Sequence, residues 1–288
     1  MPLTIPRRLA ATCEKVPERA RWLARLPGAV RELEQRWSLA LGPPFDSDEV
    51  SCSWVAPVTR ADGTSGVLKI ALPHFEGEHE MEGLRFWNGD PTARLVNADA
   101  GLGAMLLERC EPGTALRTLP EPEQDRVIAR LLPRLWRVPP KPHTFRPLSV
   151  MTEYWSKETL GGVERWPDAG LVREGLRLFA DLPRTAPSEA LLATDLHAGN
   201  VLRAQREPWL VIDPKPFVGD PAYDATQHLL NCDARLRSDP HGTIARFADL
   251  LGLDHERVRL WMFARAAAEP RKNWEEDELI DLARAIAP

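Results

Sequence analysis

Residues 195–213 read DLHAGNVLRAQREPWLVID, and this stretch decides the fold assignment. Two apolar runs flank the segment QREP at 205–208, which is typical of a β-hairpin. A hairpin that turns about Arg206 and Glu207 places Asn200 opposite Asp213 at its open end. The alternative is that Asn200 caps a turn and Asp213 begins a loop, because both residue types are common at strand ends.

An amide oxygen beside a carboxylate is a pair of hard-oxygen ligands. Mg²⁺ prefers such ligands and takes one or two of them from the protein together with the phosphates of a substrate. Asp195 precedes Asn200 by five residues, which is the spacing of the catalytic loop of phosphotransferases. In that loop the Asp accepts the proton of the attacking hydroxyl and the Asn holds a metal ion. The spacing is weak evidence by itself and gains weight from Asp213, which follows after the hairpin.

His197 lies in the same loop and has the chemistry of a general base. It is also the kind of residue that hydrogen bonds hold in place within a loop. No serine or cysteine nucleophile is arranged with it in the sequence, so the pattern disfavours acyl transfer.

Lys69 stands in the apolar stretch GVLKIAL, which is predicted to be a strand. A charge there points to water or has a partner. Only six of the 37 basic residues are lysines, so a lysine in this place is informative. A helix bearing Glu78, Glu80 and Glu82 follows, and a strand lysine paired with a helix carboxylate orients the α- and β-phosphates of ATP in kinases. We expect Glu80 to be the partner, with Glu82 as the alternative.

The surrounding pattern predicts a small strand-rich lobe. Strand character is found in WSLAL (37–41), SCSWVAPV (51–58), SGVLKIAL (65–72) and AMLLE (104–108), with a turn at 61–63 and a helix at 76–87. Two short helices with Pro17 and Pro27 in their first turns are expected to precede these strands.

After Pro112-Gly113 the pattern becomes mainly helical. Helices are predicted at 121–137, 149–158, 169–182, 222–233, 243–251, 255–268 and 275–286. The sequence therefore predicts an α+β fold of two lobes: a β-rich N-terminal lobe at 1–107 with its leading helices, a hinge at 108–113 and a larger, mostly helical lobe at 114–288.

Composition excludes several classes of protein. The chain of 288 residues is 43% hydrophobic and 27% charged, with a formal net charge of −5, which disfavours an electrostatic nucleic-acid binder. No apolar run is long enough for a membrane span, and the N-terminus lacks the apolar core of a signal peptide, so we expect a cytoplasmic protein. The four cysteines are scattered, which favours reduced thiols over disulfides or a zinc site. The sequence leaves the oligomeric state open.

A glycine-rich phosphate-binding loop is missing, since neither GxGxxG nor GxxxxGK[ST] occurs. The candidate substitute is the segment 46–53, which lies between the first two predicted strands. Its serine hydroxyls and backbone N–H groups could contact phosphate, whereas its acidic side chains would not help.

Taken together, these residues resemble the aminoglycoside phosphotransferase branch of the protein-kinase-like fold, and most closely the streptomycin 6-kinase and hydroxyurea phosphotransferase family. The resemblance extends from about Trp37 to Trp274 and is carried by MLLERCEPG (105–113), DLHAGNVL (195–202) and PWLVIDPK (208–215) with its continuation VGDPAYD (218–224). It implies a two-lobed kinase that uses ATP and Mg²⁺ to phosphorylate a hydroxyl of a small molecule.

The resemblance also implies a role for each site residue. Asp195 would be the catalytic base, Asn200 and Asp213 the Mg²⁺ ligands, and Lys69, oriented by Glu80, the phosphate-binding lysine. The backbone of the four residues that begin the hinge would receive the adenine: Glu108, Arg109, Cys110 and Glu111. Asp224 would brace the catalytic loop rather than contact the substrate.

One departure from the family pattern concerns the residues before Asp195. The family usually has His-Gly there, whereas this chain has Ala193-Thr194. The expected acceptor is an aminoglycoside-type antibiotic similar to streptomycin. The alternatives are a kinase of an endogenous sugar or secondary metabolite, and a nucleotide-binding pseudokinase that serves as an interaction module.

Overall fold

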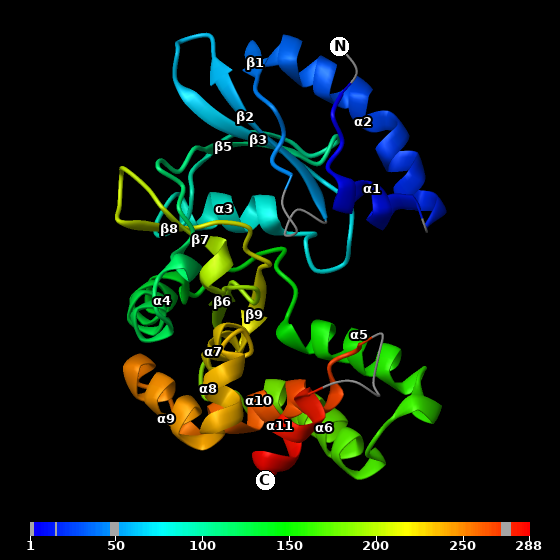
Figure 1. The fold of residues 1–288 in the computed structure, drawn as a ribbon, viewed down its shortest axis with the longest axis vertical. Coiled ribbons are helices and arrows are strands. Elements are labelled where there is room, and N and C mark those ends of the chain that lie inside the picture. Colours follow the sequence, from blue (N-terminus) through cyan, green and yellow to red (C-terminus); the bar gives the residue numbers. More distant parts are fainter. Residues whose placement is uncertain (1–2, 15, 47–51, 272–277) are drawn as a thin grey trace. The chain divides into compact units, whose positions relative to one another are not determined.

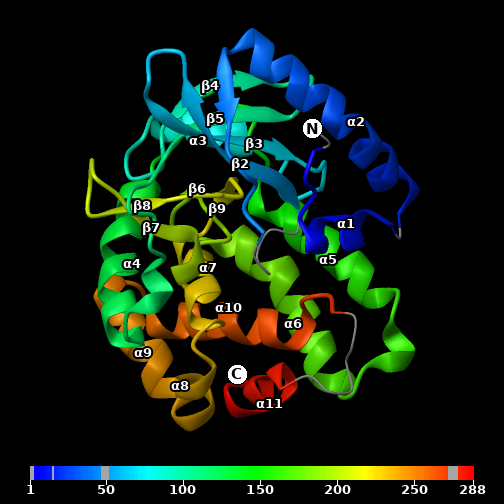
Figure 2. The same cartoon turned by 45° about the horizontal axis from the view of Figure 1, so that its top comes forward.

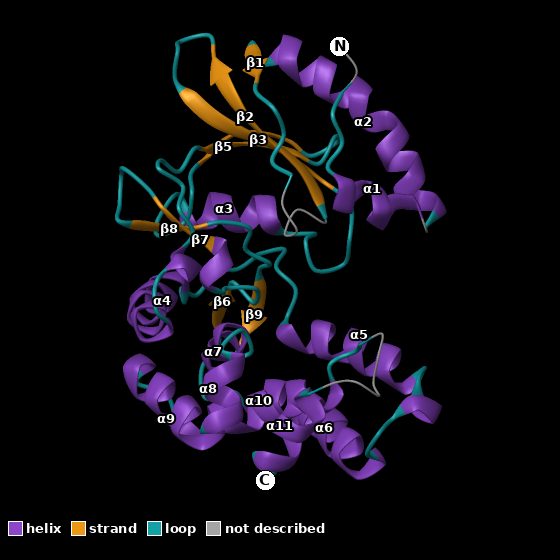
Figure 3. Ribbon diagram, viewed as in Figure 1, coloured by secondary structure: helices purple, strands orange, loops and turns teal. Residues whose placement is uncertain are grey.

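The computed structural model describes residues 3–14, 16–46, 52–271 and 278–288. The chain forms two compact units: one comprises residues 1–113 and 203–210, and the other comprises 114–202 and 211–288. The tip of the predicted hairpin, 203–210, therefore belongs to the first unit, which a division into 1–107 and 114–288 does not anticipate. A strand-rich unit and a mainly helical unit together confirm the α+β class (Figure 3).

The first unit is built on an antiparallel five-stranded sheet (Figure 1). Its strands are β1 (Leu39–Leu41), β2 (Ser53–Arg60), β3 (Ser65–Ala71), β4 (Leu95–Asp99) and β5 (Ala104–Glu108), in the spatial order β1-β2-β3-β5-β4. β2 and β3 form a hairpin whose turn contains Gly63 with φ 80°, so the predicted turn is confirmed. Lys69 of β3 is paired in register with Met105 of β5.

Helices cover both faces of this sheet (Figure 2). α1 (Arg7–Glu14) and α2 (Pro17–Arg36) pack on the face that buries Leu68 and Ile70, while α3 (Glu80–Trp87) packs on the other face against Val67. Successive strand residues point to opposite faces. Lys69 therefore shares the face of Val67 and is directed toward α3.

Helix α2 differs from the prediction. It begins at Pro17 and continues through Pro27, where the sequence suggested the start of a second helix. Leu26, Val30 and Leu33 are all buried along one side of α2, and this packing outweighs the backbone hydrogen bond that Pro27 cannot donate. The strand β4 was not predicted, because LVNAD is short and only partly apolar.

The second unit is mainly helical. Its α-helices are α4 (Glu121–Leu135), α5 (Leu148–Leu160), α6 (Ala169–Asp181), α7 (Pro221–Leu229), α8 (Asp233–Ser238), α9 (Pro240–Leu251), α10 (His255–Ala268) and α11 (Leu279–Ala285). The predicted helix at 222–233 is thus two helices, and residues 275–277 of the last predicted helix lie outside the described residues. Within the described parts of the chain, no helix is both long and apolar enough to cross a bilayer.

Helix α10 passes through the middle of the second unit and contacts α6, α7, α9 and α11 (Figure 2). Every residue from Trp261 to Ala268 is buried. The close approach of α6 depends on Gly175, because a Cβ there would lie 2.8 Å from the Cβ of Ala268. Small residues at this crossing allow the close packing of α10, which carries the buried Arg265.

Two pairs of short strands lie in the second half of the sequence: β6 (Ala190–Leu192) with β9 (Phe217–Gly219), and β7 (Val201–Arg203) with β8 (Trp209–Val211). The second pair is the predicted hairpin, with a register one residue different from the prediction. The N–H of Ile212 donates to the carbonyl of Asn200 at 2.9 Å, so Ile212, rather than Asp213, lies opposite Asn200. Asp213 begins the following loop with φ 53°.

Candidate active site

Lys69 and Glu80 form a buried ion pair in the first unit. Nζ of Lys69 donates to both carboxylate oxygens of Glu80, at 2.6 and 2.7 Å, and the two residues are only 6% and 3% exposed. Strand alternation directs Lys69 toward α3, where Glu80 is the first helical residue. The predicted pairing is therefore present, and Glu82 lies near Arg85 instead.

The predicted hinge residues follow β5. The Glu108 carboxylate accepts hydrogen bonds from Nε of Arg206 at 3.0 Å and from Nη2 at 2.9 Å. These bonds connect the tip of the hairpin to the end of β5, and both belong to the first unit. Arg109 lies 3.4 Å from Glu111, and burial raises the pKa of the Cys110 thiol to about 11. Because the Glu108 side chain is used in this way, a nucleotide contact there would come from the backbone. Residues 47–51 of the predicted phosphate-covering segment lie outside the described residues.

Asp195 and Asn200 lie together in the second unit. Asp195 is in the loop between β6 and the short 3₁₀ helix Ala198–Asn200. Nδ2 of Asn200 donates to the backbone carbonyl of Asp195 at 2.9 Å and approaches its Oδ2 at 3.4 Å. Because the amide nitrogen faces Asp195, the amide oxygen is the atom that Asn200 can offer to a cation.

Asp213 lies on a neighbouring loop, which is hydrogen-bonded to the segment that precedes Asp195. Its carboxylate forms an ion pair with Nζ of Lys215, and the backbone N–H of Lys215 donates to the carbonyl of Ala193 at 2.8 Å. The Asp213 carboxylate and the Asn200 amide oxygen are hard donors and fit Mg²⁺. Lys215 was not predicted, although its place among only six lysines was a usable signal.

Asp224 of α7 braces the loop that leads to Asp195, as the resemblance implies. Its carboxylate accepts the N–H groups of Ala193 at 3.0 Å and Thr194 at 2.8 Å, and also the indole N–H of Trp136 at 3.0 Å. Asp224 is completely buried, and burial raises its pKa to about 6. The three hydrogen bonds counteract this rise in pKa, because they stabilise the charged carboxylate in its buried position.

Thr194 stands where the family usually has glycine, and its backbone explains that preference. Its φ of 47° lies in the left-handed region, which is unfavourable for a β-branched residue. The Thr194 hydroxyl donates to the carbonyl of Lys215 at 2.6 Å, and its N–H donates to Asp224. These two hydrogen bonds hold the conformation that glycine would adopt without strain.

His197 is held within the loop. The N–H of Gly199 donates to its Nδ1 at 3.1 Å, so this nitrogen is unprotonated and acts as an acceptor. Burial and the nearby Arg117 lower the pKa of His197. Of the two interpretations of this histidine, the geometry favours a loop residue over a base.

Gln227 of α7 contacts the predicted base and was missed by sequence reasoning. Its Nε2 donates to Oδ1 of Asp195 at 2.8 Å. A neutral polar residue in a helix follows no recognisable motif, so nothing in the sequence singled it out.

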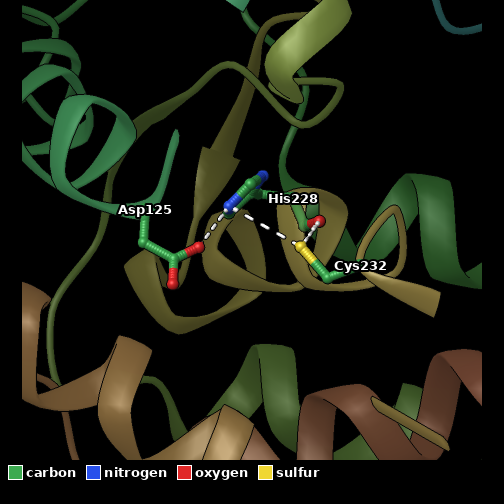
Figure 4. Close-up of side chains that lie close together, drawn as sticks. All are labelled: Asp125, His228 and Cys232. Atoms are coloured by element: carbon green, nitrogen blue, oxygen red, sulfur yellow. Dashed lines mark hydrogen bonds and ion pairs between the residues drawn. The ribbon is translucent and has the colours of Figure 1, made fainter. Parts of the chain in front are cut away.

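One cluster of potential metal ligands occurs in the described part of the chain: Asp125, His228 and Cys232 (Figure 4). Nε2 of His228 lies 2.7 Å from Oδ1 of Asp125. Arg235 donates to both Asp125 oxygens, at 2.6 and 2.8 Å, and to Sγ of Cys232 at 3.1 Å. Burial raises the pKa of the Cys232 thiol to about 11, so the thiol is protonated at neutral pH. With a guanidinium supplying the positive charge, the cluster is a hydrogen-bonded anchor between α4, α7 and α8 rather than a metal centre.

Comparison with solved structures defines the class of the fold. A choline kinase from Streptococcus pneumoniae superposes with a TM-score of 0.60 over 91% of each chain, at 11% sequence identity. The fold is therefore protein-kinase-like, with a strand-rich part and a mostly helical part.

The family follows from the sequence. Residues 36–277 match the family described as aminoglycoside/hydroxyurea antibiotic resistance kinase, and the chain belongs to this family of phosphotransferases. It is 38% identical to streptomycin 6-kinase from Streptomyces glaucescens, over 91% of this chain and 88% of that protein. It is 36% identical to hydroxyurea phosphotransferase from Kitasatospora aureofaciens, over 91% of this chain and 77% of that protein.

Proposed function

We propose that this protein transfers the γ-phosphate of ATP to a hydroxyl of an aminoglycoside-type antibiotic, with streptomycin as the first candidate acceptor. The observation that carries the proposal is the loop in which Asn200 donates to Asp195 at 2.9 and 3.4 Å, beside the loop of Asp213. The names of the related streptomycin 6-kinase and hydroxyurea phosphotransferase support an antibiotic-type acceptor.

Asp195 is the catalytic base in this proposal. A carboxylate within hydrogen-bond reach of the acceptor hydroxyl takes its proton while the oxygen attacks the γ-phosphorus. The transfer is direct and in line, and catalysis comes from positioning rather than from a covalent intermediate. The fixed loop around Asp195 supports this role because the carboxylate is held before the acceptor arrives.

The first unit binds ATP in this proposal. Lys69 contacts the α- and β-phosphates, and Glu80 fixes the position of its ammonium group. The backbone at Glu108, Arg109, Cys110 and Glu111 receives the adenine. The burial of the Lys69–Glu80 pair supports this role, since two charges are otherwise costly to remove from water.

Asn200 and Asp213 would hold Mg²⁺ through the amide oxygen and the carboxylate. Bound there, the ion supplies positive charge against the phosphate oxygens. Lys215 adds a fixed cation beside the Asp213 carboxylate. We expect the enzyme to act in the cytoplasm, where ATP is abundant.

Two alternatives remain distinct proposals. A kinase of an endogenous sugar or secondary metabolite would use the same residues on another acceptor. A pseudokinase would bind nucleotide without transfer, and the Ala193-Thr194 departure is the feature that favours it. The hydrogen bonds of Thr194 count against this second alternative, because they keep the loop formed without glycine.

The test is ADP release by the purified protein with Mg²⁺ and ATP, in parallel reactions with streptomycin, other aminoglycosides, hydroxyurea and no acceptor. Asp195→Ala is expected to abolish acceptor-dependent release while sparing nucleotide binding, and Asp213→Asn to weaken Mg²⁺-dependent ATP binding as well. Release that matches the blank with every antibiotic would reject the proposed acceptor class. Unchanged turnover in Asp195→Ala would remove the assignment of the base.

A further inference from the structure

The side chain of Gln227 lies between Asp195 and a buried arginine. Its Nε2 donates to Oδ1 of Asp195 at 2.8 Å, while its Oε1 accepts from Nη2 of Arg265 at 2.7 Å. Both ends of one amide are therefore occupied. Asn200 approaches the other carboxylate oxygen, Oδ2, at 3.4 Å, so each oxygen of Asp195 faces an amide donor.

The chemistry of the neighbours fixes the orientation of the Gln227 amide. A guanidinium only donates hydrogen bonds and an ionised carboxylate only accepts them. The amide oxygen must therefore face Arg265, and the amide nitrogen must face Asp195. A flipped amide would lose both hydrogen bonds.

Arg265 is itself held firmly in α10. It is 4% exposed, and it donates to Thr226 at 2.8 Å and to Glu269 at 2.7 Å. Its guanidinium also lies over the ring of Tyr223, 5.1 Å from the centroid. A buried charge with this many fixed contacts is a rigid support for the amide that it holds.

We propose that Gln227, held by Arg265, is a positioning residue that fixes the side-chain rotamer of Asp195 for proton abstraction. The inference rests on the proposed role of Asp195 as the base. With Oδ1 bound to Gln227, the carboxylate cannot turn freely, and Oδ2 becomes the oxygen presented to the acceptor hydroxyl. A displacement of about 1 Å in a reacting group can cost on the order of 10²-fold in rate.

A purely structural role makes a different prediction. In that case Gln227 only satisfies Arg265, and any acceptor at position 227 that keeps the fold would also keep the activity. Gln227→Glu separates the two roles, because its carboxylate still accepts from Arg265 but has no N–H to donate to Asp195. Gln227→Met removes both contacts at similar volume.

The test measures kcat, KM for ATP and thermal midpoint for both Gln227 variants, for Asp195→Ala and for the control Thr226→Val. The control removes another hydrogen bond to Arg265 without touching Asp195. We expect both Gln227 variants to lose about 10- to 100-fold in kcat with little change in KM for ATP. Gln227→Glu places a second carboxylate beside that of Asp195, so it should lower the thermal midpoint as well as kcat. Thr226→Val should lower the midpoint and leave kcat unchanged.

The outcomes distinguish this inference from the proposed function. Wild-type kcat in Gln227→Glu, with Asp195→Ala inactive, would overturn the positioning role and leave the base assigned. Wild-type turnover in Asp195→Ala would overturn the base assignment, and the inference would fall with it. A loss of kcat in Thr226→Val equal to that in Gln227→Glu would show general disturbance of α7 and would also overturn the inference.

Discussion

Lys69 is a buried charged residue on a strand, and the carboxylate of Glu80 balances its charge. Lysine is scarce in the chain, and acids crowd the following helix, so the pair could be predicted. Its selection of Glu80 over Glu82 depends on where α3 begins and on which face of β3 Lys69 occupies. Stability and nucleotide binding can therefore be separated by variants of this pair.

We expect Lys69→Met alone to be destabilised by about 3–5 kcal/mol, because Glu80 is left as an unpaired buried charge. The double variant Lys69→Met/Glu80→Met should recover most of that stability and still bind ATP at least about 10-fold more weakly than the wild type. Urea unfolding and calorimetric titration with Mg²⁺–ATP measure the two effects. A double variant that binds ATP normally would refute the phosphate-binding role.

Thr194 offers a second prediction at the scale of single residues. Its hydroxyl donates a buried hydrogen bond to the backbone carbonyl of Lys215. Thr194→Val keeps the shape and loses the donor, so we expect a loss of about 1–3 kcal/mol. Thr194→Ser keeps the donor and should stay close to the wild type. Equal unfolding free energies for the two variants would contradict this account of the loop.

Other residue positions were beyond sequence reasoning. The hairpin at 200–213 was predicted, but its register was wrong by one residue, because the turn at 205–208 does not reveal which residue is its centre. Gln227 and Arg265 lie 32 and 70 positions after Asp195 in the sequence. Only the packing of α7 and α10 brings them to the loop of Asp195.

At the scale of elements, the cluster of Asp125, His228 and Arg235 joins three helices of the second unit. Burial alone raises the pKa of Asp125, but hydrogen bonds from Arg235 and His228 outweigh burial and lower the pKa from 3.8 to about 2. A carboxyl with a lowered pKa in the folded state stabilises the fold above its unfolded pKa. Its contribution is therefore complete above about pH 4 and is lost as the pH falls toward 2.

We expect Asp125→Asn to destabilise the protein by about 2 kcal/mol at pH 7. The difference from the wild type should shrink as the pH falls from about 4 to about 2, where the wild-type carboxyl also becomes neutral. Unfolding free energies of both proteins across this range provide the check. A difference that stays constant with pH would show that the charge of Asp125 does not stabilise the anchor.

Some elements were predicted with their observed bounds, and others were missed. β5 agrees with the predicted AMLLE segment at 104–108, and α10 with the predicted helix at 255–268. β6 and β9 have three residues each and were missed, since so short an apolar run has no period to recognise. Pro27 was given too much weight, because tertiary packing along α2 overrides a local breaker.

At the scale of the whole molecule, the family match at residues 36–277 spans both units. The buried Lys69–Glu80 pair belongs to the first unit, and the loops of Asp195 and Asp213 belong to the second. The order of these residues along the chain was enough to predict the class of protein. The identity of the acceptor depends on surfaces that no sequence motif describes. Its assignment therefore relies on the relatives and on experiment.

The most direct measurement of the central claim is mass spectrometry of streptomycin after incubation with the protein, Mg²⁺ and ATP. We predict a singly phosphorylated streptomycin with the wild type and none with the isosteric Asp195→Asn, while both proteins bind ATP. Streptomycin recovered unmodified from the wild type, or phosphorylated equally by Asp195→Asn, would contradict the account.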